Sequence, residues 1–104
     1  MTIDRKSVRD GDRVCVAHAG CDHSGPYAHV YTGVVVAAGS DGSFVYRTDA
    51  GRVDTVQPWS VCSITATEAE SWEAAATRLA KLAESLTNLA AECRAKGAIV
   101  TVQA

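Results

Sequence analysis

The longest regular pattern of hydrophobic positions lies in the last third of the chain. Between Thr67 and Lys96, apolar residues recur at alternating spacings of three and four, which is the period of one face of an α-helix. The residues of this stripe are Trp72, Ala75, Leu79, Leu82, Leu86, Leu89 and Cys93. Thr67 and Glu70 have the spacing of a capping box, and Gly97 is placed to end a helix. The pattern therefore predicts one amphipathic helix over 67–97.

Short apolar runs separated by turn residues come before this helix. They predict strands at 13–17, 29–38, 43–48, 52–57 and 61–65. Between the first two strands, the polar and glycine-rich stretch 20–26 is expected to be a loop. Gly33 indicates a bend or bulge inside the second strand. After the helix, residues 98–102 predict a short C-terminal strand, which has to pair with a sheet edge or with another copy of the chain.

The order of these elements suggests how the single domain is organised. We expect an α+β fold with a polar lead-in over 1–10, a five-stranded β-barrel over 11–66, the amphipathic α-helix over 67–97 and a C-terminal strand over 98–104. A barrel is favoured because a curled sheet leaves no exposed edges.

Three short stretches of the barrel region point to a known architecture. They are Gly11-Asp12-Arg13-Val14, Gly33-Val34-Val35 and Val56-Gln57-Pro58-Trp59. With a long loop, two tight hairpins and a corner before the last strand, this region resembles the SH3-like small barrels, which include Tudor-, KOW- and Agenet-type modules. The resemblance implies a topology and a binding role, with no particular activity.

The predicted helix is long for a chain of this size. Thirty residues at 1.5 Å each span ~45 Å, whereas a compact domain of about 100 residues has a radius of gyration of ~13 Å. A straight helix would therefore extend past the barrel while still apolar. We expect a homodimer whose interface is the stripe Trp72, Leu79, Leu82, Leu86, Leu89 and Cys93. The alternative is a helix that packs on its own barrel, since a wide apolar stripe is also typical of that arrangement.

Composition narrows the possible functions. The 104 residues carry ten basic and twelve acidic side chains, for a net charge of −2, which creates no long-range field that would attract DNA or an anionic membrane. The sequence shows neither an apolar signal region nor a run of about 20 apolar residues. We therefore expect a cytoplasmic location and no membrane partner. In that compartment cysteines are expected as thiols or metal ligands and not as disulfides.

One cluster contains the residue types that bind zinc. Cys15, His18, Cys21 and His23 supply two thiols and two imidazoles within nine positions, and a tetrahedral zinc site needs four such ligands. Their spacing lacks the CxxC pair of common zinc motifs. The alternative interpretation is a half-buried Cys15 beside polar histidines in a loop, and in that case the protein needs no cofactor.

The aromatic and basic residues of the barrel region suggest a binding surface. Small barrels of the Tudor type bind methylated side chains in aromatic cages, and the same residue types are common at protein interfaces. The candidates are Tyr27, Tyr31, Tyr46, Arg47, Arg52 and Trp59. Basic residues near the N-terminus leave a nucleic-acid-binding barrel as the alternative, although acidic residues are interleaved among them.

The sequence contains no nucleophile–base–acid set and no glycine loop of the phosphate-binding type, so we expect no catalytic residues and no enzyme activity. The hypothesis that remains is a small protein-interaction module that binds another protein. A compact chain of this kind suits an accessory protein of a phage or mobile element, such as an inhibitor of a host protein complex.

Overall fold

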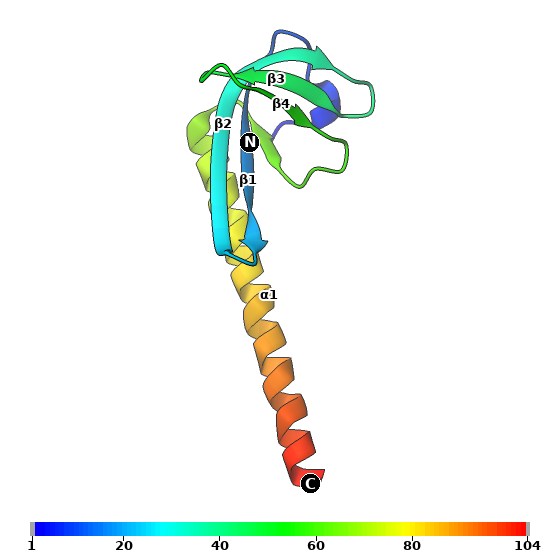
Figure 1. The fold of residues 1–104 in the computed structure, drawn as a ribbon, viewed down its shortest axis with the longest axis vertical. Coiled ribbons are helices and arrows are strands. Elements are labelled where there is room, and N and C mark those ends of the chain that lie inside the picture. Colours follow the sequence, from blue (N-terminus) through cyan, green and yellow to red (C-terminus); the bar gives the residue numbers. More distant parts are fainter. Residues whose placement is uncertain (1, 104) are drawn as a thin grey trace.

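The computed structural model describes residues 2–103, with side chains as far as Val100. A 3-10 turn, η1 (Arg5–Ser7), precedes five strands and one helix. The strands are β1 (Arg13–Asp22), β2 (Gly25–Ala38), β3 (Phe44–Thr48), β4 (Val53–Val56) and β5 (Ser63–Thr65), and the helix is α1 (Glu68–Gln103). The expected α+β class, with the strands before one long helix, is confirmed (Figure 1).

All five strands belong to one antiparallel sheet with the order β4-β3-β2-β1-β5. This sheet is open, because its two edge strands, β4 and β5, do not pair with each other in the described part of the chain. The closed barrel is therefore not what the described strands form. The gap between β4 and β5 is spanned by the 57–62 loop, which the Arg5 guanidinium holds through the carbonyl oxygens of Gln57, Ser60 and Cys62.

The loop predicted over 20–26 is wrong, because β1 and β2 continue through it as a long hairpin. Their pairing runs without interruption from Arg13 opposite Val34 to Asp22 opposite Gly25. Only His23 and Ser24 form the turn, where the Asp22 carboxylate accepts a hydrogen bond from the Ser24 amide at 2.8 Å. Packing overrides the local turn signals: one face of the hairpin lies against α1 and is stabilised by that burial.

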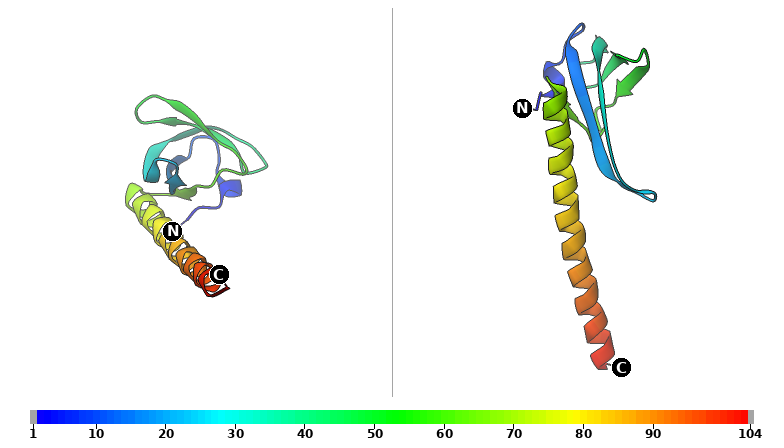
Figure 2. Two further views of the ribbon diagram at one scale, coloured as in Figure 1. Left: turned by 60° about the horizontal axis from the view of Figure 1, so that its bottom comes forward. Right: turned by 90° about the vertical axis from the view of Figure 1, so that its left-hand side faces the viewer.

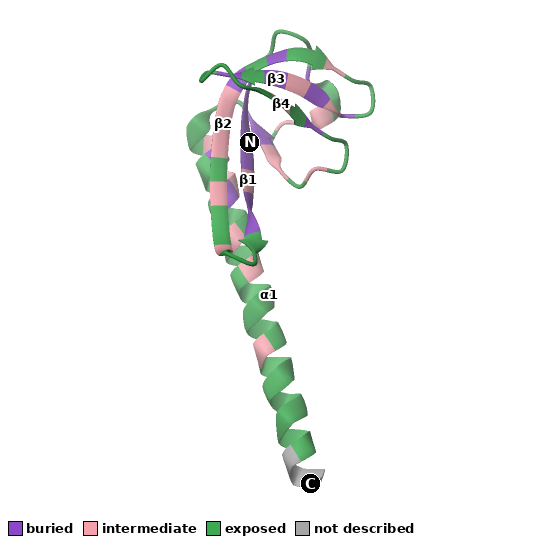
Figure 3. Ribbon diagram, in the orientation of Figure 1, coloured by how far each residue is buried: buried purple, intermediate pink, exposed green. Residues whose placement is uncertain are grey.

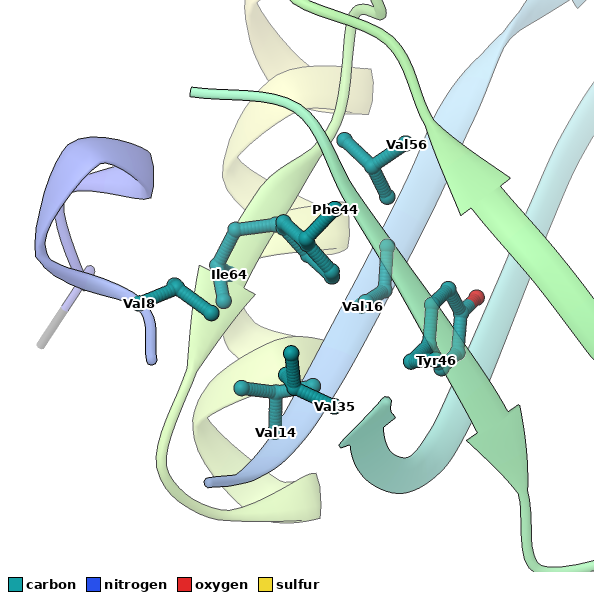
Figure 4. Close-up of a cluster of buried hydrophobic side chains, with 8 residues drawn as sticks. All are labelled: Val8, Val14, Val16, Val35, Phe44, Tyr46, Val56 and Ile64. Atoms are coloured by element: carbon teal, nitrogen blue, oxygen red, sulfur yellow. The ribbon is translucent and has the colours of Figure 1, made fainter. Parts of the chain in front are cut away.

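The main core lies on the concave side of the curled sheet. Its buried residues are Val8, Val14, Val16, Val35, Phe44, Tyr46, Val56 and Ile64 (Figure 4). Residues 2–10 therefore do more than lead into the sheet, since Val8 is only 2% exposed within this core. Gly33 is required by close packing: a Cβ atom there would lie 2.2 Å from the Arg47 carbonyl oxygen. The irregularity predicted near it is found between Val35 and Ala37, where the β2–β3 register shifts.

Helix α1 begins as predicted. The Thr67 hydroxyl accepts a hydrogen bond from the Glu70 amide at 3.2 Å and donates one to the Glu70 carboxylate at 2.9 Å. The upper half of the helix then lies along the β1–β2 hairpin (Figures 1 and 2). Ala75 and Leu79 pack there against Ala17, Ala19 and neighbouring hairpin residues, which forms a second, smaller core.

The predicted end of the helix and the C-terminal strand are both wrong. Gly97 lies within α1, and residues 98–102 are helical. A glycine inside a helix costs only about 1 kcal/mol, so it does not have to end one. A strand at 98–102 would need a neighbouring strand, but this part of the chain lies far below the sheet, where helical hydrogen bonds satisfy its backbone (Figure 1).

The helix gives the molecule its elongated shape. The principal extents are 64 × 26 × 24 Å and the radius of gyration is 18.4 Å, compared with ~13 Å for a compact domain of this length. Below the hairpin, no other described element lies beside α1, and most of the helix residues between the hairpin and Val100 are exposed (Figure 3). Leu86 and Leu89 are 55% and 54% exposed. None of the described helices is long and apolar enough to cross a membrane.

Candidate binding face on the β1–β2 hairpin

A row of aromatic rings lies on the face of β2 that points away from α1. Tyr27, His29 and Tyr31 alternate with Ala28 and Val30, which pack toward the helix. The ring centroids of Tyr27 and His29 are 5.8 Å apart with the planes at 23°, and those of His29 and Tyr31 are 6.3 Å apart with the planes at 19°. The three rings therefore stack along the strand.

Strand β1 completes this face with one ring and one glycine. His18 is paired with His29 across the hairpin, and its ring meets Tyr31 edge-on at a centroid distance of 6.0 Å. Gly20 is paired with Tyr27, and a Cβ atom on Gly20 would lie 2.9 Å from the Tyr27 hydroxyl oxygen. The glycine thus leaves room for the Tyr27 ring to lie across β1. We call Tyr27, His29, Tyr31 and His18 the aromatic face.

One charged side chain borders the aromatic face at its upper end. The Arg52 guanidinium carbon lies 5.9 Å from the centroid of the Tyr31 ring, within the range of a cation–π contact. On the other side of the sheet, which faces α1, the Asp49 carboxylate accepts hydrogen bonds from Arg13 at 3.1 and 2.6 Å and from the Thr32 hydroxyl at 2.7 Å. These hydrogen bonds hold the pKa of Asp49 below its usual value, so the carboxylate stays charged at neutral pH.

Two groups on the same side of the sheet as the aromatic face have shifted proton affinities. Burial lowers the pKa of His18, although the negative charge of Asp54 opposes this shift, so the imidazole is mainly neutral at pH 7. Burial also raises the pKa of Tyr46, with Asp54 as the second cause. The Tyr46 hydroxyl is buried and finds no hydrogen-bond partner among the described residues.

The structure brings together only part of the predicted binding set. Tyr27, Tyr31 and Arg52 meet at the aromatic face, whereas Tyr46 is fully buried in the main core and is not available to a partner. Arg47 is exposed on the opposite face of the sheet, next to Val34 in the β2–β3 register. Trp59 is 77% exposed on the loop between β4 and β5, and no described aromatic ring stacks on it.

His18 and His29 were missed as members of the aromatic face. Sequence analysis placed His18 among polar loop residues and His29 at the start of a strand, whereas the two occupy paired positions of one regular hairpin. The signal that could have found them is the alternation Tyr27-Ala28-His29-Val30-Tyr31, in which every second residue is aromatic.

The four candidate zinc ligands do not converge. Cys15 and Cys21 lie on the face of β1 toward α1, and His18 lies on the opposite face. Because β1 is extended, six positions separate the two cysteines by ~20 Å. His23 is exposed in the hairpin turn. In the described part of the chain no three His, Cys, Asp or Glu side chains are grouped closely enough to hold a metal ion.

Burial affects two of the four thiols. Burial raises the pKa of Cys15 and of Cys62, which disfavours the reactive thiolate in both. The Cys15 thiol points to the Ala66 carbonyl oxygen at 3.9 Å. The chemistry that the aromatic face offers is stacking, hydrogen bonding by imidazoles and phenols, and attraction between a guanidinium and π-systems.

The predicted dimer stripe is divided into two parts. Leu79 and Leu82 are half-buried beside the hairpin, whereas Leu86, Leu89 and Cys93 are exposed on the free part of α1. Trp72 is 47% exposed near the start of the helix, and its indole N–H donates to the Glu68 carboxylate at 3.4 Å.

No protein-family model, no curated protein and no solved structure matches this chain.

Proposed function

We propose that this chain is a non-catalytic protein-interaction module and that the aromatic face of the β1–β2 hairpin is its binding surface. The observation that carries the proposal is the stacked row of Tyr27, His29 and Tyr31 on a strand whose other side packs on α1. Tyrosine, arginine and other flat side chains are enriched where proteins bind one another, because they contribute large contact area with few rotatable bonds.

The rigidity of the surface also supports this role. The hairpin is paired over ten residues of each strand and is held by α1 from behind. A partner that binds there would lose little free energy in ordering the face. The strand order β4-β3-β2-β1-β5, with the last strand beside the first, supports the resemblance to SH3-like modules as a further part of the proposal. An adaptor or inhibitor of another protein complex, such as a phage accessory protein, would act through a surface of this kind.

Binding of single-stranded nucleic acid is the second candidate, because bases stack on aromatic rings and Arg52 lies beside Tyr31. The charges near the face oppose it. Asp22 lies at the tip of the hairpin, Asp54 acts on His18, and the whole chain has a net charge of −2. Nucleic-acid binding needs an excess of positive charge to replace counterions. If this candidate were correct, fluorescence anisotropy would detect an oligonucleotide binding at low salt, with affinity falling steeply as salt is added.

The test uses a photo-reactive phenylalanine analogue at Tyr27, with the same analogue at the exposed Val53 as the control. The protein captured from Tyr27 is then purified, and its affinity is measured for the wild-type chain, for Tyr27→Ala and for Val53→Ala. We expect Tyr27→Ala to weaken binding about tenfold or more, as at a hot spot, and Val53→Ala to leave it unchanged. Equal affinity of all three proteins for the captured partner would show that the aromatic face is not the binding surface.

A further inference from the structure

The free part of α1 is as long as the part that covers the sheet. Residues 84–103 extend the helix by ~30 Å below the hairpin, and residues 68–83 lie along the sheet over ~24 Å. The free part keeps the apolar stripe, with Leu86, Leu89 and Cys93 at spacings of three and four. An isolated helix of this length is marginal in water, and its leucines are more than half exposed in a single chain.

The outermost charges of α1 have opposite signs. Glu68, Glu70 and Glu73 lie in the first two turns, and the basic residues Arg94 and Lys96 lie in the free part. The charges between them, Arg78, Lys81, Glu84 and Glu92, balance in sign. A second copy running parallel would place like charges beside each other. A second copy running antiparallel places the acidic start of each helix beside the basic part of the other, and it also opposes the two helix dipoles.

We infer that a second copy of this chain covers the free part of α1, with the two helices antiparallel and crossing the two-fold axis near Glu84 and Ser85. In this register Glu73 lies level with Arg94 and Lys96 of the second copy. The pairs are exposed, so they select the direction of the helices more than they stabilise the dimer.

The apolar surfaces also fit this register. The upper part of the stripe is already covered by the hairpin, but a neighbouring flank of the same helix is free. Trp72, Ala76 and Ala83 form this flank, and all three are exposed. The antiparallel register brings Leu86, Leu89 and Cys93 of one copy onto the flank of the other. Alanines at spacings of seven let two helices approach closely.

The first measurement is the mass of the full-length chain by native mass spectrometry and sedimentation equilibrium. We expect a dimer. Leu86→Glu together with Leu89→Glu should convert it to a monomer, while Asn88→Glu, on the opposite side of the helix, should not. Circular dichroism checks that each variant keeps its sheet. A wild-type monomer, or a dimer that survives the double substitution, would overturn the inference.

The direction of the helices is tested by disulfide formation. In a parallel dimer, Cys93 would lie beside Cys93 of the second copy, within reach of a disulfide. In the antiparallel register the two are separated by ~27 Å. We therefore expect no Cys93 disulfide on mild oxidation of the wild-type dimer, and its rapid formation would refute the antiparallel arrangement.

The matching positive experiment combines two variants that both carry Cys21→Ser and Cys93→Ser. A mixture of Glu73→Cys and Arg94→Cys chains should form a disulfide-linked heterodimer, because these positions are level in the proposed register. The control is a mixture of Glu73→Cys and Glu84→Cys chains. This mixture should form no disulfide-linked heterodimer, since in the proposed register the two positions are ~16 Å apart along the helix axis. Absence of the linkage in the first mixture, or equal linkage in both, would contradict the register. These results are independent of whether the aromatic face binds a partner protein.

Discussion

The Ser71 hydroxyl oxygen lies 2.7 Å from the Thr65 hydroxyl oxygen, and both residues are buried where β5 passes into α1. The Thr65 hydroxyl donates its single proton to the Thr67 carbonyl oxygen at 2.8 Å, so Ser71 must be the donor to Thr65. This pair ties the first turn of the helix to the last strand, and it determines where α1 begins to run along the sheet.

Replacing Ser71 by alanine should therefore destabilise the protein. The variant removes a buried donor and leaves the Thr65 hydroxyl oxygen without the hydrogen bond from Ser71. This loss costs about 1 kcal/mol in the free energy of unfolding. Urea denaturation followed by tryptophan fluorescence measures the change. Ser85→Ala, at an exposed position of the same helix, is the control and should cause no loss. Equal stability of the two variants would mean that the Thr65–Ser71 hydrogen bond contributes nothing.

Two glycines are expected to respond in opposite ways to alanine. A Cβ atom on Gly33 would lie 2.2 Å from the Arg47 carbonyl oxygen and 2.9 Å from the Thr48 Cα atom, so β3 would have to move. Gly33→Ala should lower the free energy of unfolding by about 3 kcal/mol. A Cβ atom on Gly97 would meet no atom within 4 Å, and alanine is favoured in a helix by about 1 kcal/mol.

Gly97→Ala should accordingly increase the helical signal in circular dichroism while leaving the sheet unchanged. If Gly97→Ala instead reduced the helical signal, α1 would not continue through this position as described. If Gly33→Ala were neutral, β2 and β3 could not approach as closely as the structure places them.

The three hydrogen bonds of Arg5 should hold the 57–62 loop in place. Its guanidinium donates to the carbonyl oxygens of Gln57 at 3.2 Å and Cys62 at 3.0 Å, and to that of Ser60. Lysine carries one compact charge and cannot span three carbonyls, so Arg5→Lys should cost about 1 to 2 kcal/mol. Hydrogen exchange of the loop amides should also become faster, since local opening is easier.

The matched control for that variant is Arg47→Lys, because Arg47 is exposed and its side chain makes none of the described hydrogen bonds. In Arg47→Lys, the hydrogen-exchange rates of the amides of residues 57–62 should be the same as in the wild type. Protection of the loop that is equal in Arg5→Lys and in the wild type would show that other contacts hold it.

The partly buried position of His18 predicts a pH dependence. Burial lowers its pKa in the folded state, whereas the unfolded chain has the ordinary histidine value of about 6.5. The unfolded state therefore binds the proton more readily than the folded state. The contribution of neutral His18 to the free energy of unfolding is present above pH 6.5 and is lost as the pH falls below that value. The free energy of unfolding should decrease from pH 7.5 to pH 5.

His18→Gln should make this decrease smaller, because glutamine does not titrate in that range. Urea denaturation at a series of pH values compares the two proteins. A wild type and a variant with the same pH dependence would mean that protonation of His18 is not coupled to folding. Tyr31, whose ring contacts His18, should report the same change through its near-UV circular dichroism signal.

The helix was predictable because its signal is local. Trp72, Ala75, Leu79 and the leucines after them repeat with one period, and the capping residues Thr67 and Glu70 lie at the required spacing. Each of these features depends only on residues three or four positions apart. Its end was not predictable in the same way, because a glycine such as Gly97 permits both a stop and continuation. Among the described residues, no strand lies beside 98–102.

The hairpin and the aromatic face needed the tertiary structure. Residues 20–26 contain turn formers, yet they continue β1 and β2 because α1 covers one side of the hairpin. The same contact decides which side chains are exposed: Tyr27 and Tyr31 remain on the aromatic face, while Tyr46 is enclosed in the main core.

The sequence by itself determined the α+β class, the strand-rich first part, and an amphipathic helix too long for its own sheet. Only the tertiary structure decided that the sheet stays open between β4 and β5, that His18 and His29 join Tyr27 and Tyr31 on one face, and that Leu86 and Leu89 extend beyond the hairpin. The physical reason is the distance along the sequence over which each kind of interaction acts. Periodicity and capping act between near neighbours in the chain, whereas the exposure of a face depends on which distant element packs against its other side.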